Sequence, residues 1–337
     1  MENLTIFKLH FSSPLHLSRG KTDDYGESGE ILHSDTLKSA LFVCARTLGV
    51  NMANEEGQKF FESFLISSAF PFFRDELFFP KPMVKLPEFE KGQVKEDRQA
   101  KKHKKITFIG KSLFEDLINS GEKKLKLSHF SKDGAFISET IDFATFQSYI
   151  MVSDVQQRVT IPNDRNSDPV PYYLDRLYFT KETGLWFAVR GSEEILTIIR
   201  KSLKLLGDEG IGTDRHVGNG HFSFSESSLH LKTPKDSDHQ MILSLWCPKE
   251  MEVNPDFLVN SAYGLTKRGG YIASPANPEH LTYRKKSVYM FTEGSIFPRS
   301  IPIQGKIVDL KPNVDYINQP VWRDGQAFTI PINRSVS

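Results

Sequence analysis

The sequence predicts an α+β fold arranged as two units along a chain of 337 residues. Three observations lead to this prediction. The length corresponds to about two domains at roughly 150 residues per domain. The composition, with 39% hydrophobic and 25% charged residues, is that of an ordinary globular protein. Stretches with the two-residue alternation of strands are separated by two segments with helical spacing.

The first predicted elements are a strand and a helix. Thr5–Phe11 alternates apolar and polar side chains, which is typical of a strand. After a polar, glycine-containing stretch, Ser34 is placed to cap a helix and Gly49 to end it. The apolar face of this helix, which we expect to be buried, consists of Leu37, Leu41, Cys44 and Leu48.

A segment rich in Phe and Pro follows between residues 60 and 90, and its prolines exclude one long helix. The next stretch, Lys91–Lys105, holds seven Lys or Arg residues and two acidic residues, a local net charge of +5. It has no apolar face, so we predict a mobile loop or an inserted arm there. We therefore treat residues from about 50 to 142 as a large insertion.

Two strands and a second helix come next. The strands are predicted at Phe143–Ile161 and Leu177–Val189, the latter containing a hairpin turn. The helix begins at the cap Ser192 and is expected to end at Gly207. Its buried face is predicted to consist of Ile195, Ile199, Leu203 and Leu206.

A glycine-rich loop, 207–220, leads into a last strand at His221–Phe224. The resulting order βαββαβ is that of a ferredoxin-like (RRM-like) domain, here spanning residues 1–232 with the insertion between its first helix and second strand.

The C-terminal residues 239–337 carry further strand patterns and one short helix. The helix is predicted at Asn254–Asn260, with Asn254 as its cap. The strands are expected at Met241–Cys247, Tyr283–Phe291 and Phe328–Ile332. Because only one helix is visible, we interpret this region as a second, degenerate ferredoxin-like domain.

Composition excludes several classes of protein. Two cysteines, Cys44 and Cys247, cannot form a disulfide framework or a Cys-based zinc site, and they agree with a reducing cytoplasm. No apolar run approaches the roughly 20 residues that cross a bilayer, and Met1–His10 is strand-like rather than a signal peptide. The net charge of +1 excludes a uniformly basic protein but allows a local basic groove.

The glycine-rich loop has five glycines in fourteen residues and matches neither familiar phosphate loop. No Lys follows a glycine as a P-loop requires, and Arg215 occupies the third glycine position of a dinucleotide fingerprint. Its order is helix, loop, strand, whereas both known loops precede a helix. Close backbone approach and the cationic Arg215 and His216 suit an extended phosphate backbone. The alternative is a long turn with positive φ angles.

These residues also carry a resemblance. Gly210–Phe224 resembles the signature loop of the RAMP superfamily, the ferredoxin-like RNA-binding proteins of CRISPR systems. Five other stretches resemble the Csm-type subunit, which caps the 5′ end of the guide RNA. These stretches are Ser13–Leu17, His33–Leu37, Phe79–Pro82, Arg268–Tyr271 and Arg323–Phe328.

The resemblance implies two ferredoxin-like domains in a type III-A effector complex. It implies binding to the 5′ tag of the guide RNA, and contacts with the large polymerase-like subunit and the backbone RAMP subunit. It also implies an architectural role without catalytic residues, metal or cofactor. The residues we select as RNA contacts are His16, Lys38, Arg158, Arg165, Gly210, Ile211, Gly212, Thr213, Arg215, His216, Gly218, Gly220, Lys267, Arg268, Gly269, Gly270 and Tyr271.

Local sequence supports part of this selection. Lys267–Tyr271 joins two cations, two glycines and an aromatic ring, which can hold a phosphate and stack a base, or form a basic hairpin turn. Arg165 lies in a turn that could protrude. Lys38 and Arg46 are expected on the solvent side of the first helix, facing RNA, a partner or water.

Two other functions remain open at this stage. One is a metal-independent RAMP-type endoribonuclease that processes precursor guide RNA through a histidine. The other is a stand-alone RRM-like binder, although no aromatic RNP1 pattern lies on a predicted central strand. No HExxH spacing and no GGDD-type turn is present, which excludes those metal and cyclase sites. The histidines nearest the expected RNA face are His10, His16, His33, His216 and His221.

Overall fold

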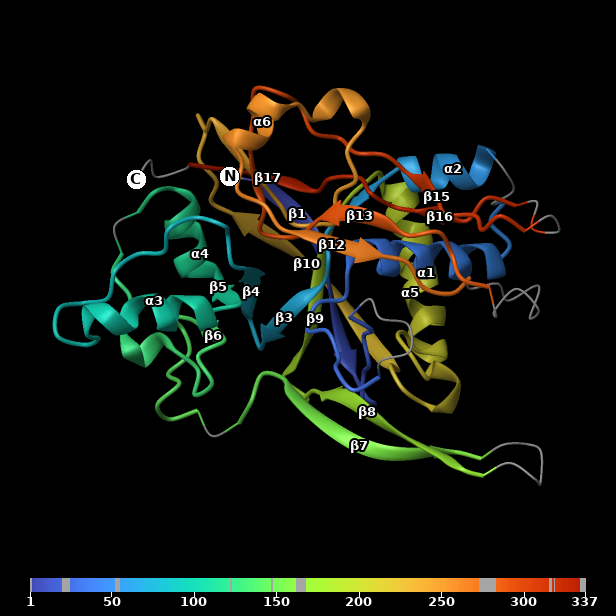
Figure 1. The fold of residues 1–337 in the computed structure, drawn as a ribbon, viewed down its shortest axis with the longest axis horizontal. Helices are drawn as coiled ribbons and strands as arrows, with labels where there is room; N and C mark the ends of the chain where they lie inside the picture. Colours follow the sequence, from blue (N-terminus) through green and yellow to red (C-terminus); the bar gives the residue numbers. More distant parts are fainter. Residues whose placement is uncertain are drawn as a thin grey trace.

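A computed structural model describes residues 2–19, 25–51, 55–121, 123–146, 148–161, 168–272, 283–314, 317 and 319–333. Its largest feature is an eight-stranded sheet with the order β10-β1-β9-β3-β4-β5-β6, in which β2 also pairs with β9 (Figure 1). The strands are β1 (Glu2–Phe11), β2 (Leu65–Ile66), β3 (Phe70–Phe73), β4 (Glu76–Pro80), β5 (Phe108–Gly110), β6 (Phe136–Ile137), β9 (Thr183–Arg190) and β10 (Phe222–Leu231).

The helices lie around this sheet. They are α1 (Ser34–Thr47), α2 (Glu55–Glu62), α3 (Glu96–Lys105), α4 (Lys111–Ile118), α5 (Glu193–Glu209) and α6 (Pro255–Val259). Short 3-10 turns occur at Leu127–His129, Arg215–Val217 and Glu250–Glu252. In the described part of the chain, no helix combines the length and apolar character that a bilayer span requires.

Strand β1 shows how the sheet divides the core. Its side chains alternate between the two faces. Ile6 packs with Ile296 and Phe328 of the C-terminal region. Phe7, the next residue, packs with the apolar face that α1 and α5 share. The central sheet is therefore buried between two helices on one face and C-terminal strands on the other.

Helix α1 confirms most of its predicted face, since Leu37, Leu41 and Cys44 are buried. Leu48 is 48% exposed because it follows the end of the helix. Gly49 has a φ of 87°, as expected at a helix end. The prediction that Ser34 caps the helix is wrong. His33 is the cap residue, and the Ser34 backbone N–H donates to Ser68 Oγ.

Helix α5 begins as predicted, with Ser192 accepting a hydrogen bond from the Ile195 backbone N–H. It runs past Gly207 and ends at Gly210, whose φ is 79°. A Cβ on Gly207 would overlap the carbonyl oxygen of Phe222. This glycine allows close packing between helix and strand β10, which is why it does not terminate the helix.

The insertion is predicted incorrectly in one respect. Strands β2 and β3, inside residues 50–142, belong to the central sheet, with β3 between β9 and β4. Pro71 lies within β3, where it is in register with Leu185 of β9, and only Phe72 and Phe73 pair with β4. All four β3 side chains are buried.

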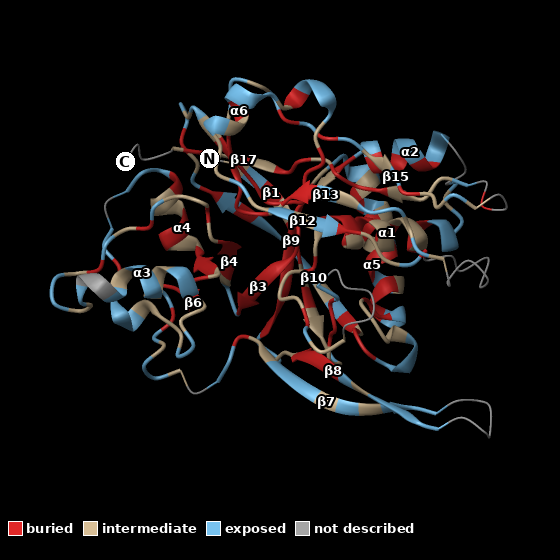
Figure 2. Cartoon of the chain, viewed as in Figure 1, coloured by how far each residue is buried: buried red, intermediate tan, exposed pale blue. Residues whose placement is uncertain are grey.

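The strand predicted at Phe143–Ile161 lies outside the sheet. It forms β7 (Val152–Thr160), which pairs along its length with β8 (Val170–Tyr178). The two strands project as a separate hairpin whose outer part is exposed (Figures 1 and 2). A hairpin arm has the same alternating pattern as a sheet strand, so the sequence could not distinguish the two.

The C-terminal region contains the predicted helix as α6, with Asn254 Oδ1 accepting a hydrogen bond from the Phe257 backbone N–H. Its described strands form three small sheets rather than one. These are β14-β11-β17 (Ile296–Pro298, His239–Ile242 and Thr329–Ile332), β12-β13 (Leu265–Arg268 and Val288–Phe291) and β15-β16 (Val308–Asp309 and Trp322–Arg323).

Candidate nucleic-acid interface

The glycine-rich loop folds back on the segment that follows β1. The Ile211 backbone N–H donates to the Gly220 carbonyl oxygen at 3.0 Å. The Gly220 N–H donates to the Pro14 carbonyl at 2.8 Å, and the Thr213 N–H to the His16 carbonyl at 3.0 Å. Two stretches that carried the RAMP resemblance, far apart in the chain, are thus joined by backbone hydrogen bonds.

The loop glycines have two different roles. Gly210, Gly212 and Gly220 have φ angles of 79°, 93° and 74° and lie against neighbouring backbone. A Cβ on Gly212 would be 2.5 Å from the His16 carbonyl oxygen, and one on Gly220 would overlap the Ile211 carbonyl. Gly218 also has a positive φ, 88°, but a Cβ there would meet nothing within 4 Å. A Cβ on Gly212 or Gly220 would therefore meet the protein's own backbone, and the positive φ that we expected at these glycines is present at both.

The exposed edge of the loop consists of residues 215–218. His216, Val217 and Gly218 are exposed, and Arg215 is half-buried, with Nη1 4.0 Å from Glu209 Oε2. Ile211 is buried and Thr213 half-buried. The loop therefore has a fixed inner layer and an outer edge that presents a cation, an imidazole and an unobstructed backbone.

Beneath the loop is a buried polar layer that the sequence analysis identified only in part. His16 is fully buried, and its Nδ1 donates to the Asp175 carbonyl oxygen at 2.6 Å. Arg176 donates to Gln156 Oε1 and, at 3.5 Å, to Asn219 Oδ1. Three nitrogen atoms in this layer have no hydrogen-bond partner among the residues that the structure describes: His16 Nε2, Arg176 Nε and Asn219 Nδ2.

Arg176 was missed by the sequence analysis. The signal that could have revealed it is the charged pair Asp175-Arg176 between Leu174 and Leu177, both of which are buried. A buried cation in such a strand requires hydrogen-bond acceptors or an opposite charge around it. Here that environment joins β8 to the loop through Asn219.

The projecting hairpin carries the next candidates. Arg158 is half-buried on β7, opposite Tyr172 on β8. Val155, Val159, Val170 and Tyr173 are all more than half exposed on this hairpin. Arg165 lies outside the described residues.

The stretch 267–271 divides between surface and interior. Lys267 is exposed on β12, opposite the exposed Tyr289 on β13. Tyr271 is also exposed, and the Arg284 guanidinium lies 5.4 Å from its ring centroid. Gly270 has a φ of 105° and open space around it. These positions remain compatible with RNA contact.

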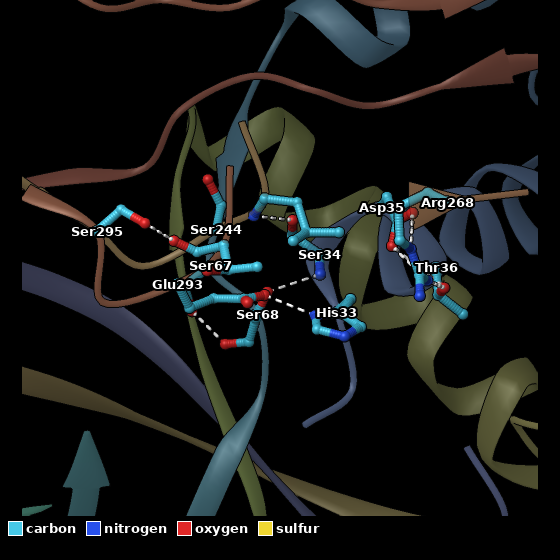
Figure 3. Close-up of polar contacts among 12 residues, drawn as sticks. His33, Ser34, Asp35, Thr36, Ser67, Ser68, Ser244, Arg268, Glu293 and Ser295 are labelled. Atoms are coloured by element: carbon cyan, nitrogen blue, oxygen red, sulfur yellow. Dashed lines mark hydrogen bonds and ion pairs between the residues drawn. The ribbon is translucent and has the colours of Figure 1, made fainter. Parts of the chain in front are cut away.

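The assignment of Arg268 as an RNA contact is wrong, because its side chain points inward. Its guanidinium donates to both carboxylate oxygens of Asp35, at 2.9 and 3.0 Å, and to Thr36 Oγ1 at 2.9 Å (Figure 3). Arg323 binds the same carboxylate and also donates to the Gly269 carbonyl oxygen at 2.7 Å. Although burial opposes ionisation, the two guanidinium groups hold the pKa of Asp35 well below its usual range. Arg268 is committed to a buried ion pair rather than to a phosphate.

The assignment of Lys38 as an RNA contact on the solvent side of α1 is also wrong, because this residue is fully buried. Its Nζ donates to the Phe64 carbonyl oxygen at 2.7 Å and to Gln326 Oε1 at 2.9 Å, and it pairs with Asp324 Oδ1 at 3.2 Å. Burial lowers the pKa of Lys38 and raises that of Asp324. No RNA phosphate can reach this ammonium group in the described structure.

A third contact completes this buried network, which we call the α1–C-terminal network and define as Asp35, Lys38, Glu293 and their partners. The Glu293 carboxylate is buried and accepts hydrogen bonds from Ser68 Oγ and, at 2.7 Å, from His33 Nδ1 (Figure 3). Ser34 Oγ accepts a hydrogen bond from the Leu245 backbone N–H at 3.0 Å. The motifs 33–37 and 323–328 therefore join the start of α1 to the C-terminal region.

The histidines considered for catalysis are dispersed among different roles. His10 Nε2 lies 3.1 Å from Ser225 Oγ, His33 belongs to the α1–C-terminal network, and His16 is buried beneath the loop. His216 is exposed and His221 half-buried. Within the described ranges, no group of three or more His, Cys, Asp or Glu side chains is arranged to hold a metal ion.

Comparison with known proteins gives a consistent result. Residues 235–332 match the CRISPR Csm4 C-terminal domain family. A "CRISPR system Cms protein Csm4" from Mycobacterium tuberculosis (strain CDC 1551 / Oshkosh) is 30% identical over 220 residues, covering 64% of this chain and 70% of that protein. The Csm4 protein of Streptococcus thermophilus is 26% identical over 261 residues, covering 74% of this chain and 75% of that protein.

Solved structures show the same fold. One is from a Csm3–Csm4 subcomplex of the type III-A CRISPR-Cas interference complex, with a TM-score of 0.65, 19% identity and coverage of 98% of this chain and 100% of that chain. Another is from a Csm1–Csm4 cassette in complex with cA4, with a TM-score of 0.62, 18% identity and full coverage of both chains. Together with the sequence relatives, these similarities show that this chain belongs to the Csm4 family of RAMP proteins.

Proposed function

We propose that this protein is a non-catalytic subunit of a type III-A CRISPR (Csm) antiviral complex. It anchors the 5′ tag of the guide RNA and links the large polymerase-like subunit to the RAMP backbone. Membership in the Csm4 family supports the assignment to the complex. The solved complexes in which Csm4 proteins occur with Csm1 and with Csm3 support the two partners. We expect it to act in the cytoplasm.

One structural observation carries the RNA-binding role. The loop 210–220 is fixed from inside by backbone bonds to Pro14 and His16, while Arg215–Gly218 remains at the surface. Through Asn219 and Arg176 the same loop contacts the base of the projecting hairpin. A rigid loop edge beside an exposed arm suits an extended RNA backbone, since phosphate contacts position a strand without reading its sequence. Lys267, Gly270 and Tyr271 would provide a second contact.

We further infer that residues 1–232 form a ferredoxin-like unit in a modified version of the predicted order. Strands β1, β3, β9 and β10 together with α1 and α5 follow one another in the required βαββαβ sequence. Their sheet order, β10-β1-β9-β3, fits that unit. The insertion then lies between the second and third strands of the unit, from β4 to β8. Residues 239–337 form the second, degenerate domain.

If the exposed edge of the loop binds RNA, a substitution there should weaken RNA binding without lowering stability to the same degree. Replacing Arg215 with alanine should raise the Kd for guide RNA roughly tenfold, because a charge-assisted phosphate contact contributes about 1.5 kcal/mol. The loss should be similar for different RNA sequences, and the salt dependence should fall by about 0.7 in log–log slope. Binding at several salt concentrations and thermal melts would measure both effects. Arg299→Ala, which removes another exposed arginine, is the matched control.

Two outcomes would contradict the proposal. Unchanged RNA binding by Arg215→Ala with a lowered melting temperature would make the loop a structural turn only. Metal-free cleavage of repeat RNA that is lost in His216→Ala would assign the protein the catalytic role of a RAMP-type endoribonuclease instead.

A further inference from the structure

The Lys-rich stretch 91–105 is ordered in a way that the sequence analysis did not expect. Of the two predicted alternatives, a mobile loop or an inserted arm, the mobile loop is wrong over residues 96–105, which form helix α3 (Glu96–Lys105). The stretch carries a net charge of +5 in a chain whose total is +1, so the remainder carries a net −4. Positive charge is therefore concentrated in one short element.

Aromatic stacking fixes the inner face of α3. The His103 ring stacks on Phe89 with ring centroids 5.2 Å apart, and Phe89 stacks on Phe130 at 5.4 Å. Lys102 Nζ lies 5.9 Å from the centroid of the Phe130 ring. Lys81 Nζ donates to the His103 carbonyl oxygen at 3.0 Å. These contacts come from segments outside the helix, so they are not visible in its own sequence.

The outer face of α3 presents four exposed cations: Arg98, Lys101, Lys104 and Lys105. Their spacing of three and four residues places them side by side, where like charges destabilise a helix. Among the side chains that the structure describes, which do not include those of Glu96 and Asp97, no carboxylate is paired with any of these four cations. The face is both exposed and electrostatically uncompensated, so a polyanion would stabilise it.

The chemistry of this face selects among polyanions. Protein interfaces depend on aromatic or aliphatic anchors, and membrane-surface helices on a broad apolar face. Ala100 is the single apolar residue of α3 and offers neither. A nucleic-acid backbone requires only cations at suitable spacing. From Arg98 to Lys105 the helix rises about 10 Å. This length corresponds to roughly three phosphates of one strand at 3.4 Å along the axis of a duplex.

We propose that the outer face of α3 binds the sugar–phosphate backbone of a nucleic-acid strand, independently of its sequence. This site is distinct from the glycine-rich loop. Helix α3 precedes β5, in the half of the sheet that ends at β6, whereas the loop leads into β10 at the opposite edge (Figure 1). A strand bound at α3 therefore makes contacts additional to those of the loop.

The test compares two triple variants of the full chain with equal loss of charge. K101Q/K104Q/K105Q removes the proposed site, and K201Q/K204Q/K235Q removes three exposed lysines elsewhere. The probe is a fluorescent oligouridylate, titrated between about 50 and 200 mM salt. The first variant should lower the slope of log K against log salt by about 2, and the control should leave it nearly unchanged. Circular dichroism and melting temperature would confirm that both variants fold.

Three results would overturn this inference. One is an equal change of slope in both variants, which indicates bulk charge only. Another is an unchanged slope in the α3 variant. The third is equally strong competition by polyglutamate, which indicates an acidic protein partner. The α3 effect is measured against the parent chain, so failure of the proposed loop function would leave this outcome unaffected. If the loop also binds the RNA backbone, Arg215→Ala should add to the α3 effect independently.

Discussion

Replacing Asp35 with alanine is expected to lower the free energy of unfolding by about 3–5 kcal/mol. The Asp35 carboxylate is completely buried and is bound by the guanidinium groups of Arg268 and Arg323. Its removal would leave two buried cations without their counter-charge. Among the described residues, Arg323 Nε already has no hydrogen-bond partner. Urea denaturation of the variant and the parent protein would measure the loss.

A matched control and a compensating variant sharpen this test. Glu55 is also an acidic residue in the first turn of a helix, but it is exposed, so Glu55→Ala should cost no more than about 0.5 kcal/mol. Replacing Asp35, Arg268 and Arg323 together by apolar residues should recover part of the loss, because apolar groups can substitute for a buried ion cluster. A loss below about 1 kcal/mol for Asp35→Ala would show that the network contributes little to stability.

The α1–C-terminal network shows where sequence reasoning reached its limit. The motifs at 33–37, 268–271 and 323–328 were correctly selected as unusual, and the family assignment that they supported is confirmed. Arg268, in one of these motifs, and Lys38, which follows another, were nevertheless assigned to RNA. Arg268 lies 233 positions from Asp35, and Lys38 lies 286 positions from Asp324. A cation near glycines looks the same whether its partner is a phosphate or a distant buried carboxylate.

Local features were predicted well where local physics determines them. The Ser192 and Asn254 caps and the positive φ of Gly49 depend on neighbours within a few residues. The errors occurred where distant segments decide the structure. Strand β3 is defined by its pairing with β9, more than 100 positions later, and α3 is held by Phe89 and Phe130. Periodicity within a segment contains no information about either contact.

The second large effect is expected at Gly220. Gly220→Val should lower the free energy of unfolding by at least about 3 kcal/mol, because two penalties combine. The φ of 74° is strained for any residue with a Cβ and most of all for a β-branched one. The new Cβ would also overlap the Ile211 carbonyl oxygen, which belongs to the rigid backbone and cannot rotate away. The bond between the Ile211 N–H and the Gly220 carbonyl would be lost as the loop moved.

Gly220→Ala and Gly218→Ala form the matched pair for this comparison, because the introduced side chain is then the same. Gly218 has nearly the same backbone strain, with a φ of 88°, but no neighbour within 4 Å of a new Cβ. Its cost should therefore be limited to about 1–2 kcal/mol of strain. Chemical denaturation of both variants would separate steric overlap from strain, and similar losses at the two positions would contradict the close packing of Gly220. If the difference holds, weakened RNA binding in Gly220 variants reflects a displaced loop, whereas weakened binding in Gly218→Ala reports on the exposed edge that RNA would contact.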